Sequence, residues 1–480
     1  MSSGRDFNRR GEALIVERIR AAVIVLRLGV ALGVLAGALQ VLVGAFRHVV
    51  SHGFIWLSQD YVWMTPVGTV VFFLAAAAPV ALIALAAPGL SWARIAAFLF
   101  GALAALSLLL LVDRMHHLAS LVVSLGIGTR VAAWVAPDAA RRSASLGRVA
   151  ILASLGLGLI SAWREFSFRR AERAQIAALP AAPADAPNVL VIILDTVRAA
   201  SMSFLGYSRE TTPHLAALGA NGAVFEQAHS TAPWTLPSHA GMFTGRYPSQ
   251  LPTDWRTPLD GAAPTLAEAL ARRGYRTAGF AANHFYTSRE SGLTRGFEHY
   301  EDYKRTPKQV LLSSSLAQTR LFWQLLQGSG VRDRLVAVAQ MDLRLQVMWT
   351  SHRKLAPEAT AEFLRWQEGV SGRPFLAFLN LYDAHLPYDP PAPWDSKFGT
   401  ARTPLDLYDG GIAYMDDALG ALFRELASRG VLDRTLVIVS SDHGEAFGEH
   451  GLHGHGNSLY RTEIHVPLVV SLPGRVPGGT

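Results

Sequence analysis

The sequence predicts an α/β/α sandwich with a mainly parallel sheet, preceded by an all-α transmembrane bundle. Two observations lead to this fold class. Long runs of Ala, Leu, Val and Gly fill the first 165 residues, and from Asn188 onward β-like apolar runs alternate with helix-like stretches. Such alternation is typical of a parallel sheet whose two faces are covered by helices. We therefore expect a transmembrane anchor over residues 1–165, a linker over 166–187 and an α/β domain over 188–480.

Five stretches of the first part approach the roughly 20 apolar residues that are needed to cross a bilayer. We expect membrane spans at Leu28–Phe46, Met64–Ala87, Ile95–Val112, Leu118–Ala136 and Leu146–Trp163. The fourth stretch contains Arg130 and the fifth contains Arg148. The alternative for these two is a pair of helices that lie at the membrane interface.

The arginines predict which side of the membrane the α/β domain occupies. Six arginines lie before the first span, and three more lie from Arg141 to Arg148. Both groups belong on the cytoplasmic side, so five spans place the α/β domain of a multi-pass inner-membrane protein outside the cytoplasm. Four arginines from Arg164 to Arg173 run against this orientation, and four spans would reverse it.

Charge and cysteine content exclude several classes of function. The net charge of +7 is partly due to the arginines beside the spans. The expected partner of this charge is therefore the membrane lipid bilayer and not a nucleic acid. The chain has no cysteine, which excludes disulfides and a cysteine nucleophile.

The α/β domain follows a Pro/Ala tether at Pro180–Pro187. Four of its apolar runs end in polar residues: Val189–Leu194 at Asp195, Arg276–Ala282 at Asn283, Phe375–Tyr382 at Asp383 and His385, and Thr435–Ser440 at Asp442 and His443. Because sites in such sheets form beyond the carboxyl ends of the strands, we expect these side chains to share one site. Residues 306–368 interrupt the pattern with amphipathic helices, including Leu321–Leu326 and Leu343–Trp349, which either cover the site, touch the membrane or simply pack.

The donors at two of these strand ends fit a metal ion beside a hydroxyl nucleophile. Asp195, Asp442 and His443 offer oxygen and nitrogen ligands, and an imidazole favours Zn²⁺ or Mn²⁺ over Ca²⁺. Thr235 precedes Leu-Pro-Ser and a helical stretch that closes at Gly245. Its hydroxyl would lie near a helix N-terminus, which favours a phosphoryl anion, and a metal would make its alkoxide accessible. The alternative is that Thr235 or Ser238 only caps the helix.

A histidine-rich, glycine-rich loop follows Asp442. It carries four histidines, His443, His450, His453 and His455. One interpretation is acid or base chemistry at the site, and the other is a surface tract that binds metal incidentally. We favour the site, because the loop starts at a strand end that bears Asp442.

The segment from Asn188 to the chain end resembles the sulfatase family of the alkaline phosphatase superfamily. The family signature Cys-x-Pro-Ser-Arg-x-x-Leu-x-Thr-Gly-Arg is matched in register by Pro237, Ser238, Thr244, Gly245 and Arg246. Further matching blocks stand in order at Leu194–Arg198, Gly296–Tyr300, Asp383–Tyr388, Ser441–Glu445 and Gly448–Gly451.

The resemblance implies a role for each candidate residue. Asp195, Asp442 and His443 would bind a divalent metal, with Thr235 at the nucleophile position and also at the ion. His385 would contact the charged group of the substrate and, like His455, could act in catalysis. The remaining substrate-binding candidates are His239, which stands where sulfatases carry an arginine, Arg246, His450 and Asn283.

Where the sequence departs from the family pattern, it favours a reaction at phosphorus over a reaction at sulfur. Sulfatases convert Cys or Ser to formylglycine, and Thr235 cannot yield that aldehyde. The combination of a Thr nucleophile with an Asp-His metal pair is similar to the active sites of phosphoethanolamine transferases and lipoteichoic acid synthases. These enzymes also have a five-span anchor. Ala200 stands where relatives commonly have an Asp, which puts a second metal in doubt. A separate departure is that the chain ends soon after Val466.

We therefore predict a membrane-anchored, metal-dependent hydrolase or transferase that acts on phospho-esters of lipid head groups or envelope glycans. The first alternative is a sulfuric ester hydrolase that acts on sulfo-esters without formylglycine. The second alternative is a non-catalytic membrane protein that keeps the sulfatase fold for binding.

Overall fold

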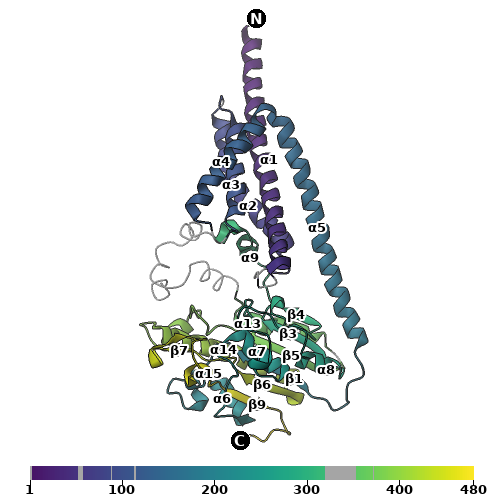
Figure 1. Ribbon diagram of the computed structural model, residues 1–480, viewed down its shortest axis with the longest axis vertical. Coiled ribbons are helices and arrows are strands. Elements are labelled where there is room, and N and C mark those ends of the chain that lie inside the picture. The colour runs from purple at the N-terminus through teal and green to yellow at the C-terminus, as the bar shows by residue number, and fades with distance from the viewer. Residues whose placement is uncertain are drawn as a thin grey trace.

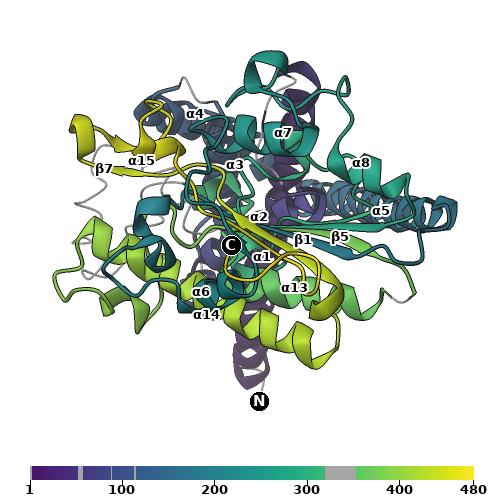
Figure 2. The same cartoon turned by 90° about the horizontal axis from the view of Figure 1, so that it is seen from below.

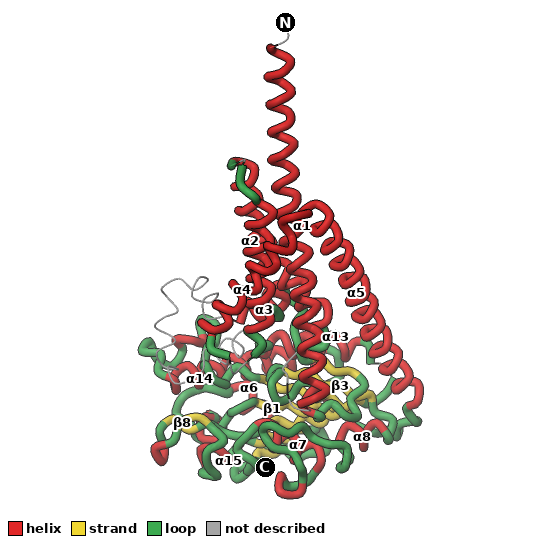
Figure 3. The backbone as a smooth tube through the Cα atoms, turned by 45° about the horizontal axis from the view of Figure 1, so that its top comes forward, coloured by secondary structure: helices red, strands yellow, loops and turns green. Residues whose placement is uncertain are grey.

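The computed structural model describes residues 3–51, 54, 58–87, 89–112, 115–318, 353–370 and 372–480. The expected helical stretches at Leu321–Leu326 and Leu343–Trp349 lie outside these residues. The described chain has an entirely helical part followed by a part that holds all of its described strands (Figure 3).

The first part consists of five long helices: α1 (Ser3–Ser51), α2 (Tyr61–Ala86), α3 (Trp92–Leu109), α4 (His117–Val135) and α5 (Ala139–Ala178). By length and composition, four stretches of the described chain could cross a membrane: Leu14–Val50, Tyr61–Ala86, Trp92–Leu109 and His117–Ala178. The last stretch has 62 residues and contains both the fourth and the fifth expected span. It turns at the short helix η1 (Ala136–Asp138), so that α4 and α5 run in opposite directions (Figure 1).

Small residues let the helices of this part pack closely. A Cβ atom on Gly37 of α1 would lie 2.4 Å from Pro66 Cα of α2, and one on Gly128 of α4 would lie 2.7 Å from Phe98 O of α3. Phe73 and Phe100 are buried in the apolar core that these helices share. Close approach of this kind is the usual basis of helix association in membranes, where the hydrophobic effect between helices is weak.

The second part contains a seven-stranded sheet in the order β2-β9-β6-β1-β5-β3-β4. Its strands are β1 (Asn188–Leu194), β2 (Ala223–Val224), β3 (Arg276–Ala281), β4 (His299–Glu301), β5 (Phe375–Leu381), β6 (Thr435–Ser440) and β9 (Leu468–Ser471). β1 pairs in parallel with β5 and β6, β3 pairs in parallel with β5 and β4, and β9 pairs antiparallel with β6 and β2. The mainly parallel sheet predicted from the sequence is therefore confirmed.

Helices cover both faces of this sheet (Figure 2). On one face lie α6 (Pro213–Ala220), α13 (Ala356–Glu368) and α14 (Pro404–Ser428), and on the other lie α7 (Thr235–Thr244) and α8 (Leu266–Ala271). Leu379 of β5 faces the first layer with Leu419 of α14, and Phe378 faces the second layer with Leu236 of α7. Alternate side chains of β5 are therefore buried on opposite faces, as expected for a central strand. Three short elements complete this part, β7 (Ala446–Phe447), β8 (His453–Gly454) and α15 (Arg461–Ile464).

A partly buried histidine joins the end of α5 to the sheet. His299 of β4 contacts Glu172 of α5 through Nδ1 at 3.1 Å and Glu301 through Nε2 at 2.9 Å. Burial alone would lower the pKa of His299, but the two carboxylates raise it to about 9. The charged imidazole therefore bridges α5 and β4.

This bridge predicts a pH-dependent stability. Because the folded pKa of about 9 exceeds the usual histidine pKa of about 6.5, the stabilisation is complete below pH 6.5 and is lost as the pH rises through 9. We expect the loss to be on the order of 2 kcal/mol after allowance for partial exposure. Thermal unfolding of the purified chain between pH 6 and 9.5 measures it. His299→Gln should flatten this part of the profile, and an unchanged profile in that variant would contradict the assignment.

Candidate metal and nucleophile site

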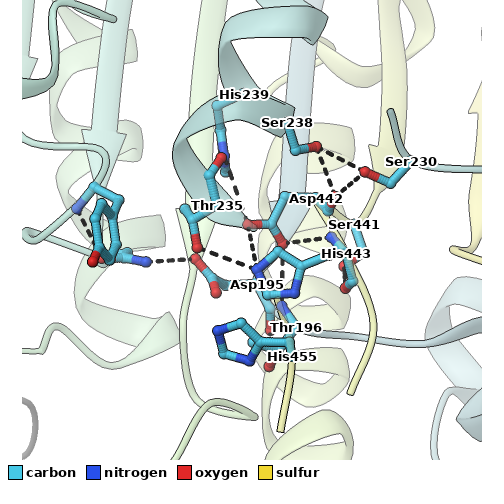
Figure 4. Close-up of polar contacts among 12 residues, drawn as sticks. Asp195, Thr196, Ser230, Thr235, Ser238, His239, Ser441, Asp442, His443 and His455 are labelled. Carbon is cyan, nitrogen blue, oxygen red and sulfur yellow. Dashed lines mark hydrogen bonds and ion pairs between the residues drawn. The ribbon is translucent and has the colours of Figure 1, made fainter. Parts of the chain in front are cut away.

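The ends of two adjacent parallel strands bring three potential metal ligands together (Figure 4). Asp195 directly follows β1, and Asp442 and His443 follow β6, which pairs with β1. One ligand atom from each residue lies within 4.8 Å of the others, and all three side chains are buried. The parallel pairing of β1 and β6 therefore produces this cluster.

Amide donors hold the Asp195 carboxylate. Its Oδ2 accepts hydrogen bonds from Asn283 Nδ2 at 2.9 Å and Asn380 Nδ2 at 3.2 Å. Burial and the neighbouring Asp442 carboxylate raise the pKa of Asp195 well above its usual value, against the effect of these amides. A cation at the site would reverse this effect by favouring the ionised carboxyl.

Asp442 and His443 are oriented by backbone groups. Asp442 Oδ1 accepts hydrogen bonds from the backbone N–H groups of Thr196 at 3.1 Å and His443 at 3.0 Å. His443 Nδ1 lies 3.0 Å from Gly444 O, so the Nδ1–H tautomer donates there and leaves the Nε2 lone pair available. Burial lowers the pKa of His443 to about 4, which keeps the ring neutral as a metal ligand must be.

The cluster fits a divalent cation. Among the described residues, Asp195 Oδ1 and Asp442 Oδ2 accept no hydrogen bond although both atoms are buried. Two such carboxylate oxygens and a neutral imidazole nitrogen form a donor set suited to Zn²⁺ or Mn²⁺. An unpaired buried carboxylate is costly, so a bound cation gives these atoms the partner that they lack.

Thr235 faces this donor set from the first turn of α7. Its Oγ1 lies 3.2 Å from His443 Nε2, and the side chain is buried. Trp234 is the N-cap of α7 and makes no side-chain cap hydrogen bond, so neither Thr235 nor Ser238 is the cap. Ser238 instead donates to Asp442 O at 2.7 Å, which ties the first turn of α7 to the strand end after β6.

His239 lies one helical turn after Thr235, and its ring points toward the Asp442 carboxylate. Its Nδ1 lies 2.8 Å from Thr235 O and 3.6 Å from Asp442 Oδ2. Burial lowers the pKa of His239, so the ring is neutral near neutral pH. A neutral imidazole would not carry the charge of the arginine that the family resemblance leads us to expect here, and it packs one turn behind Thr235.

Two more histidines line the other side of the cluster. The His455 ring lies 4.3 Å from the His443 ring, and the His385 ring lies 5.2 Å from the His455 ring. Burial would lower the pKa of His455, but Glu445 Oε1 lies 3.1 Å from its Nδ1 and the pKa is raised. Burial and the neighbouring His455 lower the pKa of His385 well below its usual value. The two rings therefore differ in their readiness to carry a proton.

Two candidate residues lie outside this cluster. Arg246 is exposed beyond the C-terminal end of α7, whereas Thr235 begins that helix. His450 is exposed and stacks on Tyr460, with ring centroids 3.9 Å apart. Its backbone φ of 55° places it in a sharp turn. Asn283 does reach the site, but as a hydrogen-bond donor to Asp195.

Asn380 and Glu445 belong to the site although the sequence motifs gave them no role. Asn380 is a buried amide inside the apolar strand β5, and Glu445 is a fully buried carboxylate beside His455. A polar residue within an otherwise apolar run was the available signal for Asn380. For Glu445 the signal was a carboxylate three residues after the Asp442 ligand.

Comparison with known proteins assigns the family. The family model described as Sulfatase matches residues 187–478, which is more than half of the chain. This chain belongs to the sulfatase family. The match confirms the family predicted from the sequence motifs.

Several relatives of this sulfatase-family chain are known at low sequence identity. The ulvan-active sulfatase of Formosa agariphila is 24% identical over 309 residues, which cover 60% of this chain and 56% of that protein. The choline-sulfatase of Rhizobium meliloti is 24% identical over 338 residues, which cover 61% of this chain and 64% of that protein. The chain thus spans less than two thirds of the length of these relatives. Among solved structures, the phosphonate monoester hydrolase of Agrobacterium radiobacter is 22% identical with a TM-score of 0.44, covering 60% of this chain and 68% of that one.

Proposed function

We propose that this sulfatase-family chain is a membrane-anchored, metal-dependent hydrolase or transferase that cleaves phospho-esters with Thr235 as its nucleophile. The observation that carries the proposal is the 3.2 Å contact between Thr235 Oγ1 and His443 Nε2, beside two buried carboxylates that each have one oxygen without a hydrogen bond from the described residues. A hydroxyl held against a cation site at a helix N-terminus suits attack on a phosphoryl group.

Asp195, Asp442 and His443 would hold the cation, with Thr235 beside it. When bound, a divalent ion supplies positive charge that favours the Thr235 alkoxide and the developing charge on phosphoryl oxygens. Asn283 and Asn380 keep Asp195 oriented, and the backbone of Thr196 and His443 keeps Asp442 oriented.

The proposed reaction then proceeds through two successive displacements at phosphorus. Thr235 loses its hydroxyl proton to solvent, and its Oγ1 forms a bond to phosphorus while the bond from phosphorus to the leaving oxygen breaks, which gives a phospho-threonine. His455 gives its proton to the leaving oxygen, because its contact with Glu445 favours the protonated ring. His385 is the alternative proton donor. Water or an acceptor hydroxyl then attacks phosphorus and gives its proton to the deprotonated His455, while the bond from phosphorus to the Thr235 oxygen breaks, so the outcome is hydrolysis or transfer.

The helical part supports a membrane anchor over residues 1–165. The proposed linker over 166–187 includes the end of α5, which continues to Ala178, and the proposed catalytic domain covers 188–480. The N-terminus and the turn between α4 and α5 lie at one end of the helices, and the sheet lies at the other (Figure 1). The arginines before the first span and those from Arg141 to Arg148 therefore lie away from the sheet, whereas the four arginines from Arg164 to Arg173 lie toward it, near the contact of Glu172 with His299. By the positive-inside rule the first two groups favour a catalytic domain outside the cytoplasm, at the inner membrane. Substrates at this position would be esters of lipid head groups or of envelope glycans.

Metal content measured together with two matched ester assays tests this function. We expect about one divalent ion per chain and faster cleavage of an aryl phosphodiester than of the same aryl sulfate. A chelator should abolish turnover, and Zn²⁺ or Mn²⁺ should restore it better than Ca²⁺. Faster cleavage of the sulfate would favour a sulfuric ester hydrolase, and absence of bound metal would favour a non-catalytic protein.

A further inference from the structure

We propose that a row of aromatic side chains carries the head group of a membrane lipid from the membrane boundary to Thr235. The inference rests on the proposed function and adds the residues that would receive the substrate. The row consists of Phe54, Tyr286, Trp234 and the ring of His455. Its first member belongs to the loop between α1 and α2, and its last member belongs to the catalytic cluster.

Each ring of the row contacts the next. Phe54 and Tyr286 have ring centroids 6.1 Å apart, Tyr286 and Trp234 are 5.7 Å apart, and Trp234 and His455 are 5.0 Å apart. Trp234 immediately precedes Thr235 and is the N-cap of α7. Phe54, Tyr286 and Trp234 are all partly exposed, so the row forms a surface and not an interior stack. Three ring contacts therefore connect the α1–α2 loop to the nucleophile.

The row begins at the level where a membrane boundary is expected. α2 starts at Tyr61, and Arg164 of α5 lies 6.0 Å from the Tyr61 ring and from the Phe168 ring. Trp163 beside it is 67% exposed. Exposed aromatic residues with arginine among them are typical of the interface between lipid and water. Phe54 lies in the loop that leads to Tyr61, seven residues before the start of α2.

Hydrogen bonds and close packing attach a segment of the catalytic part to the helices, so the two parts that contribute to the aromatic row are in contact. The segment Pro307–Gln318, which contains α9 (Pro307–Leu312), lies against α1, α2 and α3. Ser315 N donates to Gln40 Oε1 at 3.0 Å, and Ser315 Oγ donates to Ser107 O at 2.6 Å. A Cβ atom on Gly68 of α2 would lie 2.1 Å from Val310 O. This close, hydrogen-bonded packing holds the α9 segment against the helices, and Phe54 and Tyr286 both pack against the apolar cluster that contains Leu236.

The chemistry of the row suits a lipid head group. Tyr286 and Trp234 each combine an apolar ring with one polar group, which suits the glycerol and ester region of a phospholipid, and Phe54 adds apolar area. Trp255 lies 6.1 Å from Trp234 and is 48% exposed, and the Arg256 guanidinium lies 3.9 Å from the Trp255 ring centroid. This cation stands beside the row, where it would attract a phosphate. A phospholipid with its acyl chains in the bilayer would therefore present its phosphate toward Thr235.

Site-directed fluorescence tests lipid contact without any activity. Because the full chain has no cysteine, Phe54→Cys, Tyr286→Cys and Phe225→Cys each create one labelling site. Phe225 is a matched control, since it is 47% exposed and follows β2 at the opposite edge of the sheet from β3 and Tyr286. In vesicles of phosphatidylethanolamine and phosphatidylglycerol, a nitroxide on the lipid head group should quench labels at 54 and 286 more than at 225. Equal quenching at all three positions would overturn the proposal.

Two matched substrates test delivery to the nucleophile. One is a soluble aryl phosphodiester, and the other carries the same aryl group and an acyl chain that anchors it in the vesicle. Phe54→Ala should lower the ratio of kcat/KM for the anchored ester to that for the soluble ester by about tenfold, the effect of losing one ring contact and its apolar area. Phe225→Ala should leave the ratio unchanged, and an unchanged ratio in Phe54→Ala would contradict delivery along the row. If wild type cleaves neither ester, the proposed function fails, and the quenching result alone decides whether the row contacts lipid.

Discussion

Thr235→Ala is expected to lower phosphodiester turnover by roughly 10³-fold or more while the metal stays bound. The substitution removes the oxygen that would bond to phosphorus, and it leaves Asp195, Asp442 and His443 in place. Only one hydrogen bond to the cluster is lost, the 3.2 Å contact with His443 Nε2. Elemental analysis of the purified variant and the aryl phosphodiester assay together measure both halves of the prediction.

Two matched variants separate the nucleophile from helix packing. Thr235→Ser keeps a hydroxyl and should keep measurable turnover. Thr244→Ala removes a threonine hydroxyl at the other end of α7, where Oγ1 donates to Ala240 O, and should leave turnover near that of wild type. Unchanged turnover in Thr235→Ala would remove Thr235 from the mechanism. Loss of both turnover and metal would make Thr235 mainly a metal ligand.

The strand ends were predictable from the sequence because their signal is local. β1 is an apolar run that stops at Asp195, and β6 is an apolar run that stops just before Asp442. In each case the apolar residues indicate the strand, and the first carboxylate after them indicates where it ends. Parallel pairing then brings both ends to one edge of the sheet, as expected for this class of fold. The three candidate ligands therefore follow from the fold class and two short motifs.

Side-chain direction was not predictable in the same way. Arg246 stands in the same signature as Thr235, but ten helical residues separate the ends of α7, which is about 15 Å along the axis. The two side chains therefore lie at opposite ends of the helix. His450 resembles His455 in its glycine-rich surroundings, yet its left-handed turn directs it onto Tyr460. In a glycine-rich loop the backbone conformation decides which histidine reaches the metal cluster.

Contacts between segments that lie far apart in the sequence could not be predicted from local sequence patterns either. The amphipathic character expected for residues 306–368 did not distinguish a cover over the site from a contact with the membrane helices. In the structure, the described part of this segment before residue 319 packs on α1, α2 and α3 through Gln40 and Ser107. Asn380 is similar, because an amide inside an apolar strand has meaning only once β1 places Asp195 beside it.

Asp195→Asn should have opposite effects on the metal-free and the metal-bound protein. Asn keeps the shape of the side chain, and its carbonyl oxygen can still accept hydrogen bonds from Asn283 and Asn380. The amide nitrogen then takes the place of Oδ1, which lacks a hydrogen-bond partner among the described residues. Metal affinity should fall by more than about 100-fold, since even outer residues around metal sites cost that much, and turnover should fall with it.

Without metal, the same variant should be more stable than wild type. Burial and Asp442 raise the pKa of Asp195, so in the metal-free protein its ionised form opposes folding above the usual pKa of a carboxyl. Removing that charge should raise the free energy of unfolding by on the order of 1–3 kcal/mol near neutral pH. The gain should shrink as the pH falls, because protonation of Asp195 relieves wild type in the same way. Thermal unfolding with and without chelator across this pH range measures both effects.

The second acidic cluster of the described chain provides the control for this experiment. His214, Asp416 and Asp417 also lie close enough together to hold a metal. However, both Asp416 oxygens accept backbone hydrogen bonds from His214 and Leu215, and Asp417 Oδ2 accepts one from Trp394. Asp417→Asn should therefore change neither metal content nor turnover. If Asp417→Asn lost the metal and Asp195→Asn kept it, the ion would belong to α6 and α14, and Thr235 would have no cation beside it.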